Sequence, residues 1–208
     1  MRAFTDVITT KAQLRDAVGF PAARVARKVI TTLDAHCRLF ISLSPYVLLS
    51  TVDDTGNMDV SPKGDPPGFV QVLDDTTLAI PDRPGNKRAD GLLNIVENPR
   101  VGLLFLVPGY GETLRVGGSA RIVRDQDVLA TMAIGGRQPT LALIVNVEEA
   151  FFHCAKCAIR SALWQPQAWP DVSAIPTYAQ ITVDQTDWHE SAETVARQLR
   201  ESYKNKLY

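Results

Sequence analysis

The chain has 208 residues, of which 22 are Lys or Arg and 23 are Asp or Glu, so its formal net charge is −1. This balance argues against a general nucleic-acid binder, which needs a broad positive field. Hydrophobic residues at 45% and charged residues at 22% are ordinary for a soluble globular protein and exclude a disordered or fibrous chain. Any basic site must therefore be local.

The length suits one domain, and no Ser/Gly-rich or charged linker divides the sequence. No apolar run approaches the ~20 residues of a membrane span, and the first residues lack the apolar core of a signal peptide. The cysteines Cys37, Cys154 and Cys157 are an odd and sparse set that cannot form a secreted-type disulfide framework. We expect a cytoplasmic protein with reduced thiols and with neither a membrane nor a nucleic-acid partner.

Two helices are predicted near the start of the sequence. Thr10 and Gln13 fit a capping box, and Gly19 can end the first helix. Pro21 opens the second helix, in which apolar residues recur at three- and four-residue steps between Ala22 and Leu33. We expect this amphipathic helix to pack on a sheet.

From Arg38 onward the sequence takes the period of strands. Two apolar, β-branched runs, 39–44 and 46–52, are separated by a Ser-Pro pair. Because several connections are of hairpin length, and a parallel pair needs a crossover of about a dozen residues, most neighbouring strands should be antiparallel. The expected fold is mainly β with flanking helices, and a barrel is favoured over a doubly wound sheet. Further strands are predicted at 58–61, 69–73, 77–80, 101–107, 113–123 and 140–147.

A last helical pattern starts at Asp187, and its residues Trp188, Val195 and Leu199 share one face. The predicted organisation is therefore a single domain with N-terminal helices at about residues 10–34 and a C-terminal helix at about 187–204.

A basic segment marked by Gly and Pro, Arg83-Pro84-Gly85-Asn86-Lys87-Arg88, lies in the middle of the chain. Asn86 is the predicted N-cap of a helix that Asn98-Pro99 ends. The two cations after Asn86 would then lie in the first turn, where positive charge is unfavourable unless an anion offsets it. A phosphate there would accept charge-assisted hydrogen bonds. On spacing alone, solvated surface cations remain an equal alternative.

Three blocks stand out across roughly residues 38–164: LLSTVDDTGNMDVSPKGDPPGFV, IPDRPGNKRADGLLNIVENPRVGLLFLVPG and TLRVGGSARIV. In these blocks the sequence resembles the pyridoxamine 5′-phosphate oxidase-like flavoproteins, the FMN-binding split-barrel family. The sequence is most similar to an uncharacterised branch of that family. The resemblance implies an antiparallel FMN-binding split β-barrel, a homodimer, and FMN held in a cleft between the subunits.

The same resemblance implies which residues contact the cofactor. The strand that contacts the isoalloxazine ring in the family corresponds here to residues 60–63, with Ser61 as the ring contact. The residues that hold the phosphate correspond to the basic segment, and the side chain of Lys63 is within reach of the same group. Taken alone, Ser61 and Lys63 are ordinary turn residues. The predicted cofactor-binding residues are Val60, Ser61, Pro62, Lys63, Arg83, Asn86, Lys87 and Arg88.

A second segment contains a C-x-x-C pair, Cys154 and Cys157, which can bind metal or exchange disulfides. A zinc site needs about four ligands, and the sequence offers no second pair to complete one. We therefore expect helix-packed thiols and no metal. The resemblance places this segment near the flavin, which adds Lys156 and Arg160, one helical turn apart, to the predicted contacts. Trp164 either covers the cofactor or fills a gap in the core, and we expect it to pack in the core.

The function implied by the resemblance is that of an FMN-dependent oxidoreductase or flavin reductase acting on an unidentified small molecule. A flavin performs the hydride chemistry itself, so no catalytic triad is expected. True pyridoxamine-phosphate oxidases carry a C-terminal Arg-containing motif that grips the substrate phosphate, whereas this sequence ends in ESYKNKLY, which argues against that substrate. Two alternatives stay open: a noncatalytic flavin- or haem-binding module, and a deazaflavin-dependent reductase, whose cofactor also carries a phosphate.

Overall fold

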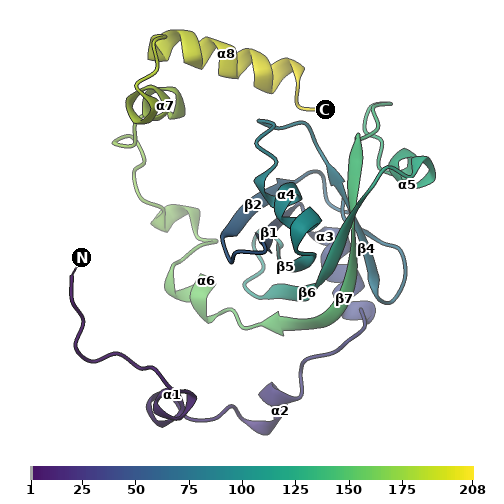
Figure 1. The fold of residues 1–208 in the computed structure, drawn as a ribbon, viewed down its shortest axis with the longest axis vertical. Coiled ribbons are helices and arrows are strands. Elements are labelled where there is room, and N and C mark those ends of the chain that lie inside the picture. The colour runs from purple at the N-terminus through teal and green to yellow at the C-terminus, as the bar shows by residue number, and fades with distance from the viewer. Residues whose placement is uncertain (1) are drawn as a thin grey trace.

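The computed structural model describes residues 2–208 as a curved sheet with helices around it and two terminal segments that extend away from it (Figure 1). The strands are β1 (Tyr46–Val52), β2 (Met58–Gly64), β3 (Gln71–Val72), β4 (Thr77–Asp82), β5 (Arg100–Leu106), β6 (Thr113–Val123) and β7 (Leu141–His153). The helices are α1 (Lys11–Val18), α2 (Ala23–Ala26), α3 (Ala35–Leu43), α4 (Asp90–Glu97), α5 (Gln126–Thr131), α6 (Lys156–Arg160), the 3₁₀ helix η1 (Pro166–Ala168), α7 (Tyr178–Thr186) and α8 (Ala192–Asn205).

The seven strands form one sheet in the order β2-β1-β5-β6-β7-β4-β3, and every neighbouring pair is antiparallel. The expected fold class, mainly β with flanking helices and antiparallel strands, is confirmed. The sheet curls as a split barrel, and over residues 2–208 no hydrogen-bonded pairing joins its two edge strands, β2 and β3.

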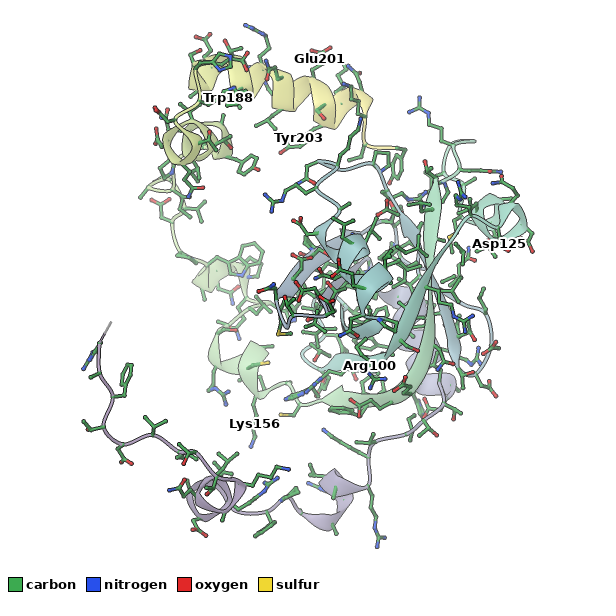
Figure 2. The ribbon with its side chains drawn as sticks, viewed as in Figure 1. Arg100, Asp125, Lys156, Trp188, Glu201 and Tyr203 are labelled. Atoms are coloured by element: carbon green, nitrogen blue, oxygen red, sulfur yellow. The ribbon has the colours of Figure 1, made fainter. Side chains whose placement is uncertain are left out.

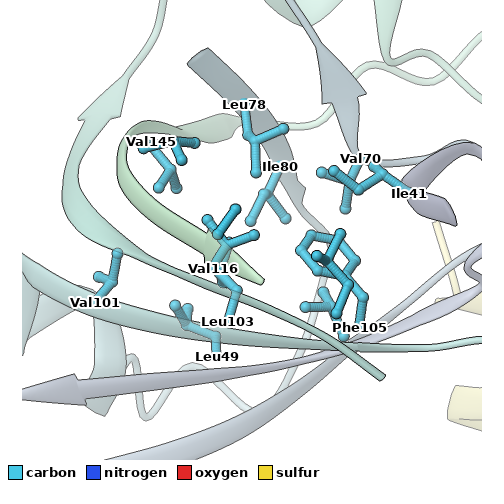
Figure 3. Packing of buried hydrophobic residues seen from close by; sticks show 14 of the residues in the cluster. Ile41, Leu49, Val70, Leu78, Ile80, Val101, Leu103, Phe105, Val116 and Val145 are labelled. Carbon is cyan, nitrogen blue, oxygen red and sulfur yellow. The ribbon is translucent and has the colours of Figure 1, made fainter. Parts of the chain in front are cut away.

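Alternation along the central strands places the core on one face of the sheet. Val47 and Leu49 on β1 are fully buried and pair in register with Phe105 and Leu103 on β5. The residue between them, Leu48, points to the opposite face, as the two-residue period of a strand requires. Figure 3 shows the packing inside the curve of the sheet, where Leu49, Leu103 and Phe105 lie with Ile80, Val116 and Val145. Burying one such side chain stabilises the fold by roughly 1.5–3 kcal/mol, and this burial favours the curved sheet.

A β-bulge interrupts the long pairing of β6 with β7 between Gly117 and Gly118. A Cβ atom on Gly118 would lie 1.9 Å from the carbonyl oxygen of Asn146, a distance that no side chain tolerates. Glycine at this position therefore lets the two strands approach at the bulge, where β6 bends.

The predicted strand 39–44 is wrong, because these residues belong to helix α3. Asp34 is its N-cap and accepts a hydrogen bond from the Cys37 backbone N–H at 2.8 Å. Cys37, Phe40 and Ile41 then face the core at helical spacing. A short apolar run has the same composition in a buried helix as in a strand, so its period alone was ambiguous.

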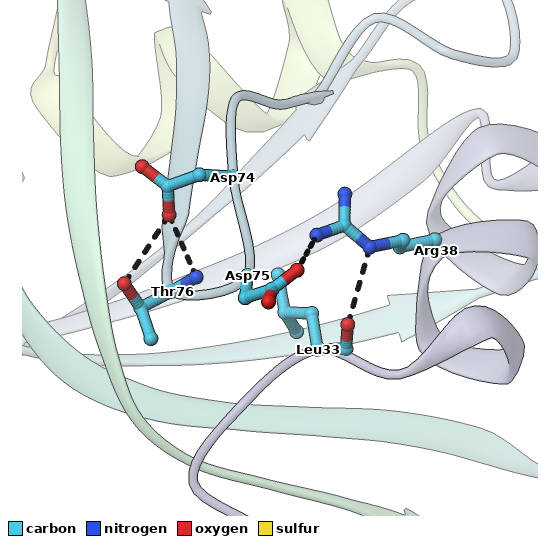
Figure 4. A network of polar contacts seen from close by, with 5 residues as sticks. All are labelled: Leu33, Arg38, Asp74, Asp75 and Thr76. Atoms are coloured by element: carbon cyan, nitrogen blue, oxygen red, sulfur yellow. Dashed lines mark hydrogen bonds and ion pairs between the residues drawn. The ribbon is translucent and has the colours of Figure 1, made fainter.

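Helix α3 is also held to the sheet by polar contacts around Arg38 (Figure 4). The Arg38 guanidinium forms an ion pair with Asp75 and donates through Nε to the Leu33 carbonyl at 3.2 Å. The neighbouring Asp74 accepts from the Thr76 backbone N–H at 2.8 Å, closing the turn between β3 and β4. These contacts hold helix α3 and the segment before it against the turn between β3 and β4.

The long amphipathic helix predicted between Ala22 and Leu33 is wrong. The structure has only the four-residue α2, and the chain then straightens so that Ile30 pairs with Ala150. Their backbone groups exchange hydrogen bonds of 3.0 and 2.7 Å. Ala150 lies beyond the part of β7 that β4 covers, so its backbone needs a partner that a helix could not supply. The preceding α1 begins with the predicted capping box and ends at Gly19 as expected, but neither α1 nor α2 has a buried residue.

The other predicted strands are confirmed with shifted ends. Strand β6 has the predicted bounds, β2 and β7 run on to Gly64 and His153, and β3 is shorter than expected. The extensions follow from pairing: Gly64 lies opposite Tyr46, and His153 lies opposite Thr113.

The C-terminal helical region is longer than predicted and divided in two. Asp187 takes a left-handed conformation that ends α7, and Ser191 caps α8 by accepting from the Thr194 backbone N–H. The two helices pack on each other, away from the sheet (Figure 1). Among the described residues, none of the helices has the length and apolar character that crossing a membrane requires.

Candidate functional site

A cavity of about 530 Å³ lies between the edge strand β2 and the loop that joins β4 to α4. We call it the anion pocket. Its wall includes each of the residues predicted on β2 and in the basic segment, so the fold brings these two stretches together. The lining residues of these two stretches are Val60, Ser61, Pro62, Lys63, Arg83, Asn86, Lys87 and Arg88.

The loop differs from the prediction in how it meets the helix. Helix α4 begins at Asp90 with Ala89 as its N-cap, so the predicted cap at Asn86 is wrong and the cations precede the first turn. The side-chain oxygen of Asn86 instead accepts from the Arg88 backbone N–H at 3.0 Å, which tightens the loop. Lys87 and Ala89 have positive φ angles of 64° and 59°. This backbone is unfavourable for residues with a Cβ, and such strain is typical of functional loops.

Arg83 is bound by protein groups on two sides. Its Nε donates to the Asp65 carboxylate at 2.6 Å, and its Nη2 donates to the Met132 carbonyl at 2.9 Å. The two side chains of this ion pair are only 16% and 2% exposed. The positive charge of Arg83 is therefore largely neutralised within the protein, and its predicted role as a phosphate contact stays a prediction.

Lys63 and Asp82 form a looser pair across the floor of the pocket, with Nζ and Oδ1 4.0 Å apart. Burial raises the pKa of Asp82 above its ordinary value, and the charge of Lys63 opposes that rise. A gap of 4.0 Å is too long for a direct hydrogen bond, so the ammonium group of Lys63 keeps donors for a further anion.

The hydroxyl of Ser61 is buried and has no hydrogen-bond partner within the described chain. It faces the start of α4, where a Cβ on Gly91 would lie 3.7 Å from this oxygen and 3.1 Å from Asp59 Oδ2. Glycine thus lets the helix approach the polar face of β2. A buried hydroxyl without a partner costs about 1–3 kcal/mol, so a ligand that satisfied it would gain that amount.

The remaining cations of the basic segment are exposed. Arg88 forms a 2.8 Å ion pair with Asp90, whereas Lys87 has no ion-pair partner among residues 2–208. The pocket therefore holds more positive charge than the protein itself neutralises, as an anion site requires.

A third wall was missed by the sequence analysis. It is built by residues 137–140, which follow a tight turn at Gly135 and Gly136, and by Tyr208. Both glycines have positive φ, and Arg137 pairs back with Ile134. Gly-Gly followed by Arg was the available signal for a turn that carries a cation, but only the fold shows that it reaches the pocket.

Lys156 and Arg160 do not line the anion pocket of this chain. Both are exposed on the short helix α6, and Figure 2 shows Lys156 well away from the loop that precedes α4. Their predicted approach to the cofactor stays a prediction, because a single chain does not bring them there.

A second and larger cavity of about 880 Å³ lies on the opposite face of the sheet, against α6. We call it the sheet-face cavity. Leu48, Gly102 and Gly117 are on its floor. Trp164, predicted in the core, is half-buried in its wall and donates from Nε1 to the Tyr110 carbonyl at 2.9 Å. The core placement predicted for Trp164 is therefore wrong.

The two thiols of the C-x-x-C segment are exposed, so their predicted packing against a helix is wrong. Cys157 lines the sheet-face cavity, and Cys154 does not. Over residues 2–208, the His, Cys, Asp and Glu side chains form no group of three or more arranged to hold a metal ion.

Comparison with known protein families gives one match. The model of the family described as pyridoxamine 5′-phosphate oxidase matches residues 33–154, which is more than half of the chain and includes β1–β7 and the basic segment. None of the curated proteins compared with this chain matches it in sequence.

Solved structures with a similar fold include proteins of differing function. A Lactobacillus delbrueckii protein described provisionally as a pyridoxamine 5′-phosphate oxidase is 26% identical, with a TM-score of 0.47 over 59% of this chain and 95% of that one. An FMN-binding protein from Syntrophomonas wolfei is 12% identical, with a TM-score of 0.44 over 56% and 83%. The haem storage protein HutZ of Vibrio cholerae is 19% identical, with a TM-score of 0.43 over 57% and 93%. At these TM-scores the likenesses decide neither cofactor nor activity.

Proposed function

The chain belongs to the pyridoxamine 5′-phosphate oxidase family, and we propose that it is an FMN-dependent oxidoreductase acting on an unidentified small molecule. The observation that carries this proposal is the anion pocket. Its unneutralised cations lie in the same cavity as the buried hydroxyl of Ser61, which has no partner within the described chain. A phosphorylated ligand with a polar ring edge would satisfy both at once.

The residues present fit FMN in charge and in hydrogen bonding. Lys63, Lys87 and Arg88 would hold the phosphate, since a dianion offsets the repulsion among them. Ser61 would meet a polar atom of the ring, and its hydroxyl can serve either as a donor or as an acceptor. Bound FMN would supply hydride and electron transfer. The chain itself orients the cofactor, keeps water from the buried floor of β2 and tunes the ring through nearby charge.

We also propose that the protein is a homodimer with the cofactor at the subunit boundary. The sheet-face cavity shares Val60 with the anion pocket, and its floor and walls include exposed apolar side chains. Phe20, Val25 and Trp169 on the terminal segments are exposed as well. A partner subunit that covered these side chains would remove apolar surface from water, which favours association. Light scattering on the purified protein should give the mass of a dimer, and the mass of a monomer would contradict this part of the proposal. The cytoplasmic location stays a prediction.

The test of the cofactor is a paired titration with FMN and riboflavin, which differ only in the phosphate. Replacing both Lys87 and Arg88 by alanine should weaken FMN binding about tenfold, because two exposed charge contacts together contribute roughly 1–1.5 kcal/mol. Riboflavin binding should not change. Arg121→Ala is the matched control, since this exposed cation on β6 lines neither cavity. Failure of the unchanged protein to bind FMN, or an equal loss for both flavins, would reject the proposal.

Turnover separates an enzyme from a binding module. Protein loaded with FMN should oxidise a reduced nicotinamide or another donor, and the bound flavin should bleach and recover. A preparation that holds haem, or that binds a deazaflavin in preference to FMN, would instead favour one of the two alternatives.

A further inference from the structure

The last residues of the chain return to the anion pocket. After α8 ends, residues 206–208 lead to the loop between β4 and α4 (Figure 1). Leu207 is 59% exposed and contributes little packing, but Tyr208 is half-buried and lines the pocket. Of residues 206–208, Tyr208 is the one that lines the pocket.

Tyr208 is held by three charged side chains. The guanidinium of Arg83 lies over its ring, 5.5 Å from the ring centre. Arg137 donates from Nη1 to the main-chain oxygen of Tyr208 at 3.0 Å. The nearby carboxylate of Asp65 favours the neutral phenol over the phenolate and so raises the pKa of Tyr208. Arg83 and Asp65 are themselves paired, so the ring rests on a fixed support.

This arrangement borders the pocket without filling it. About 530 Å³ of cavity remains between Tyr208, the loop before α4 and strand β2. Tyr208 is thus part of the wall of the cavity, and a ligand that entered would lie beside it. A plug would have left no such space.

We propose that Tyr208, together with Arg137, is a latch that closes over a phosphorylated ligand in the anion pocket and slows its release. Arg137 uses one of its five N–H donors on the main chain of Tyr208, and no other group among residues 2–208 accepts from its side chain, so four donors can bind a phosphate. Binding of the ligand and closing of the latch then support each other through the same guanidinium. The identity of that ligand as FMN rests on the proposed function; the latch itself rests on the contacts of Tyr208.

The experiment is to measure how fast FMN leaves the 208-residue protein after dilution. Tyr208→Ala should release FMN about threefold to fivefold faster, which is the range expected for losing one partly exposed cation–π contact. Tyr208→Phe keeps the ring over Arg83 and should lie between wild type and Tyr208→Ala. Arg137→Ala should speed release at least as much as Tyr208→Ala, and Arg121→Ala should not change it.

Two results would overturn the latch. Slower release or tighter binding in Tyr208→Ala would show that the residue competes with the ligand, and an unchanged rate would show that it takes no part. If wild type does not bind FMN, the proposed function fails. The latch is then tested with inorganic pyrophosphate, whose binding to wild type and to Tyr208→Ala is measured by calorimetry. Weaker pyrophosphate binding in Tyr208→Ala than in wild type then supports the latch, whereas equal binding, or no binding to either protein, rejects it.

Discussion

The two cavities of this molecule differ in size and in their polar groups, and the smaller cavity is the one with a buried hydroxyl that has no partner among residues 2–208. The sheet-face cavity is the larger, and its lining carries charges of both signs: Arg100 pairs with Glu148 at 2.6 Å, Arg115 lies over the ring of Phe151 at 5.0 Å, and Glu149 adds a second carboxylate. The anion pocket is smaller, but it contains Lys87, which no acidic side chain among residues 2–208 pairs with, and the unpartnered hydroxyl of Ser61. Unsatisfied charge and hydrogen-bonding groups, more than volume, mark the candidate ligand site.

The largest expected effect concerns the floor of the sheet-face cavity. Gly118→Ala should destabilise the fold by about 3–5 kcal/mol, because its Cβ would collide with the Asn146 carbonyl and force the bulge apart. Chemical denaturation measures this change. Gly102→Ala is the matched control, since a Cβ there meets only the Ser50 Cβ at 3.9 Å and should change stability by less than about 1 kcal/mol. Equal losses in both variants would show that the bulge is not the sensitive point.

The second effect tests whether Arg83 is a structural residue of the anion pocket. Asp65→Asn should destabilise the protein by about 2–3 kcal/mol, because it leaves a mostly buried guanidinium without its counter-charge. Thermal or chemical unfolding measures the change. If stability is unaffected and FMN binds more tightly, Arg83 is available to the ligand. Arg83 would then be a ligand-binding cation like Lys87 and not a structural residue.

A third and smaller effect comes from Asp82, which competes with a ligand for Lys63. Asp82→Asn should strengthen FMN binding by a few fold, about 1 kcal/mol or less, while riboflavin binding stays the same. Arg115→Ala, in the sheet-face cavity, is the comparison variant and should leave FMN affinity unchanged. A comparable change in that variant would mean that the two cavities act as one site.

The same residue predicts a pH dependence of stability. The pKa of Asp82 is raised on folding, so its protonated form favours the folded state. This contribution is complete below the ordinary value of 3.8 and is lost as the pH rises through the folded-state pKa. Asp82→Asn should remove that loss, so its stability relative to wild type should increase across this interval. Parallel unfolding curves at several pH values check the sign.

The smallest effect concerns backbone strain in the loop of the anion pocket. Ala89→Gly relieves a left-handed φ of 59° and should stabilise the protein by about 0.5 kcal/mol, the penalty for a Cβ being partly offset by the greater freedom of glycine when unfolded. FMN affinity should fall slightly if the strained loop holds the cations in place. Ala130→Gly, in the ordinary helix α5, is the control and should destabilise.

Several features followed from local sequence. The two-residue alternation predicted β6 at its observed bounds, and the short connections predicted antiparallel pairing. Resemblance of the blocks around Ser61 and Arg83 placed both stretches at one site, and the structure brings them to the same cavity. The run 39–44 failed because a buried helix and a strand can share one composition, and Asn86 failed as a cap because the loop continues to Ala89. The single-domain organisation and the contacts of Lys156 stay predictions.

The amino-acid sequence by itself determined the periodicity of the strands and the presence of a basic segment, because both are properties of neighbouring residues. Tertiary structure alone decided which cations stay unpaired. Arg83 is neutralised by Asp65, and Arg137 is joined to Tyr208 across a long stretch of chain. Charge pairing depends on distances between distant segments, and those distances exist only once the sheet has curled.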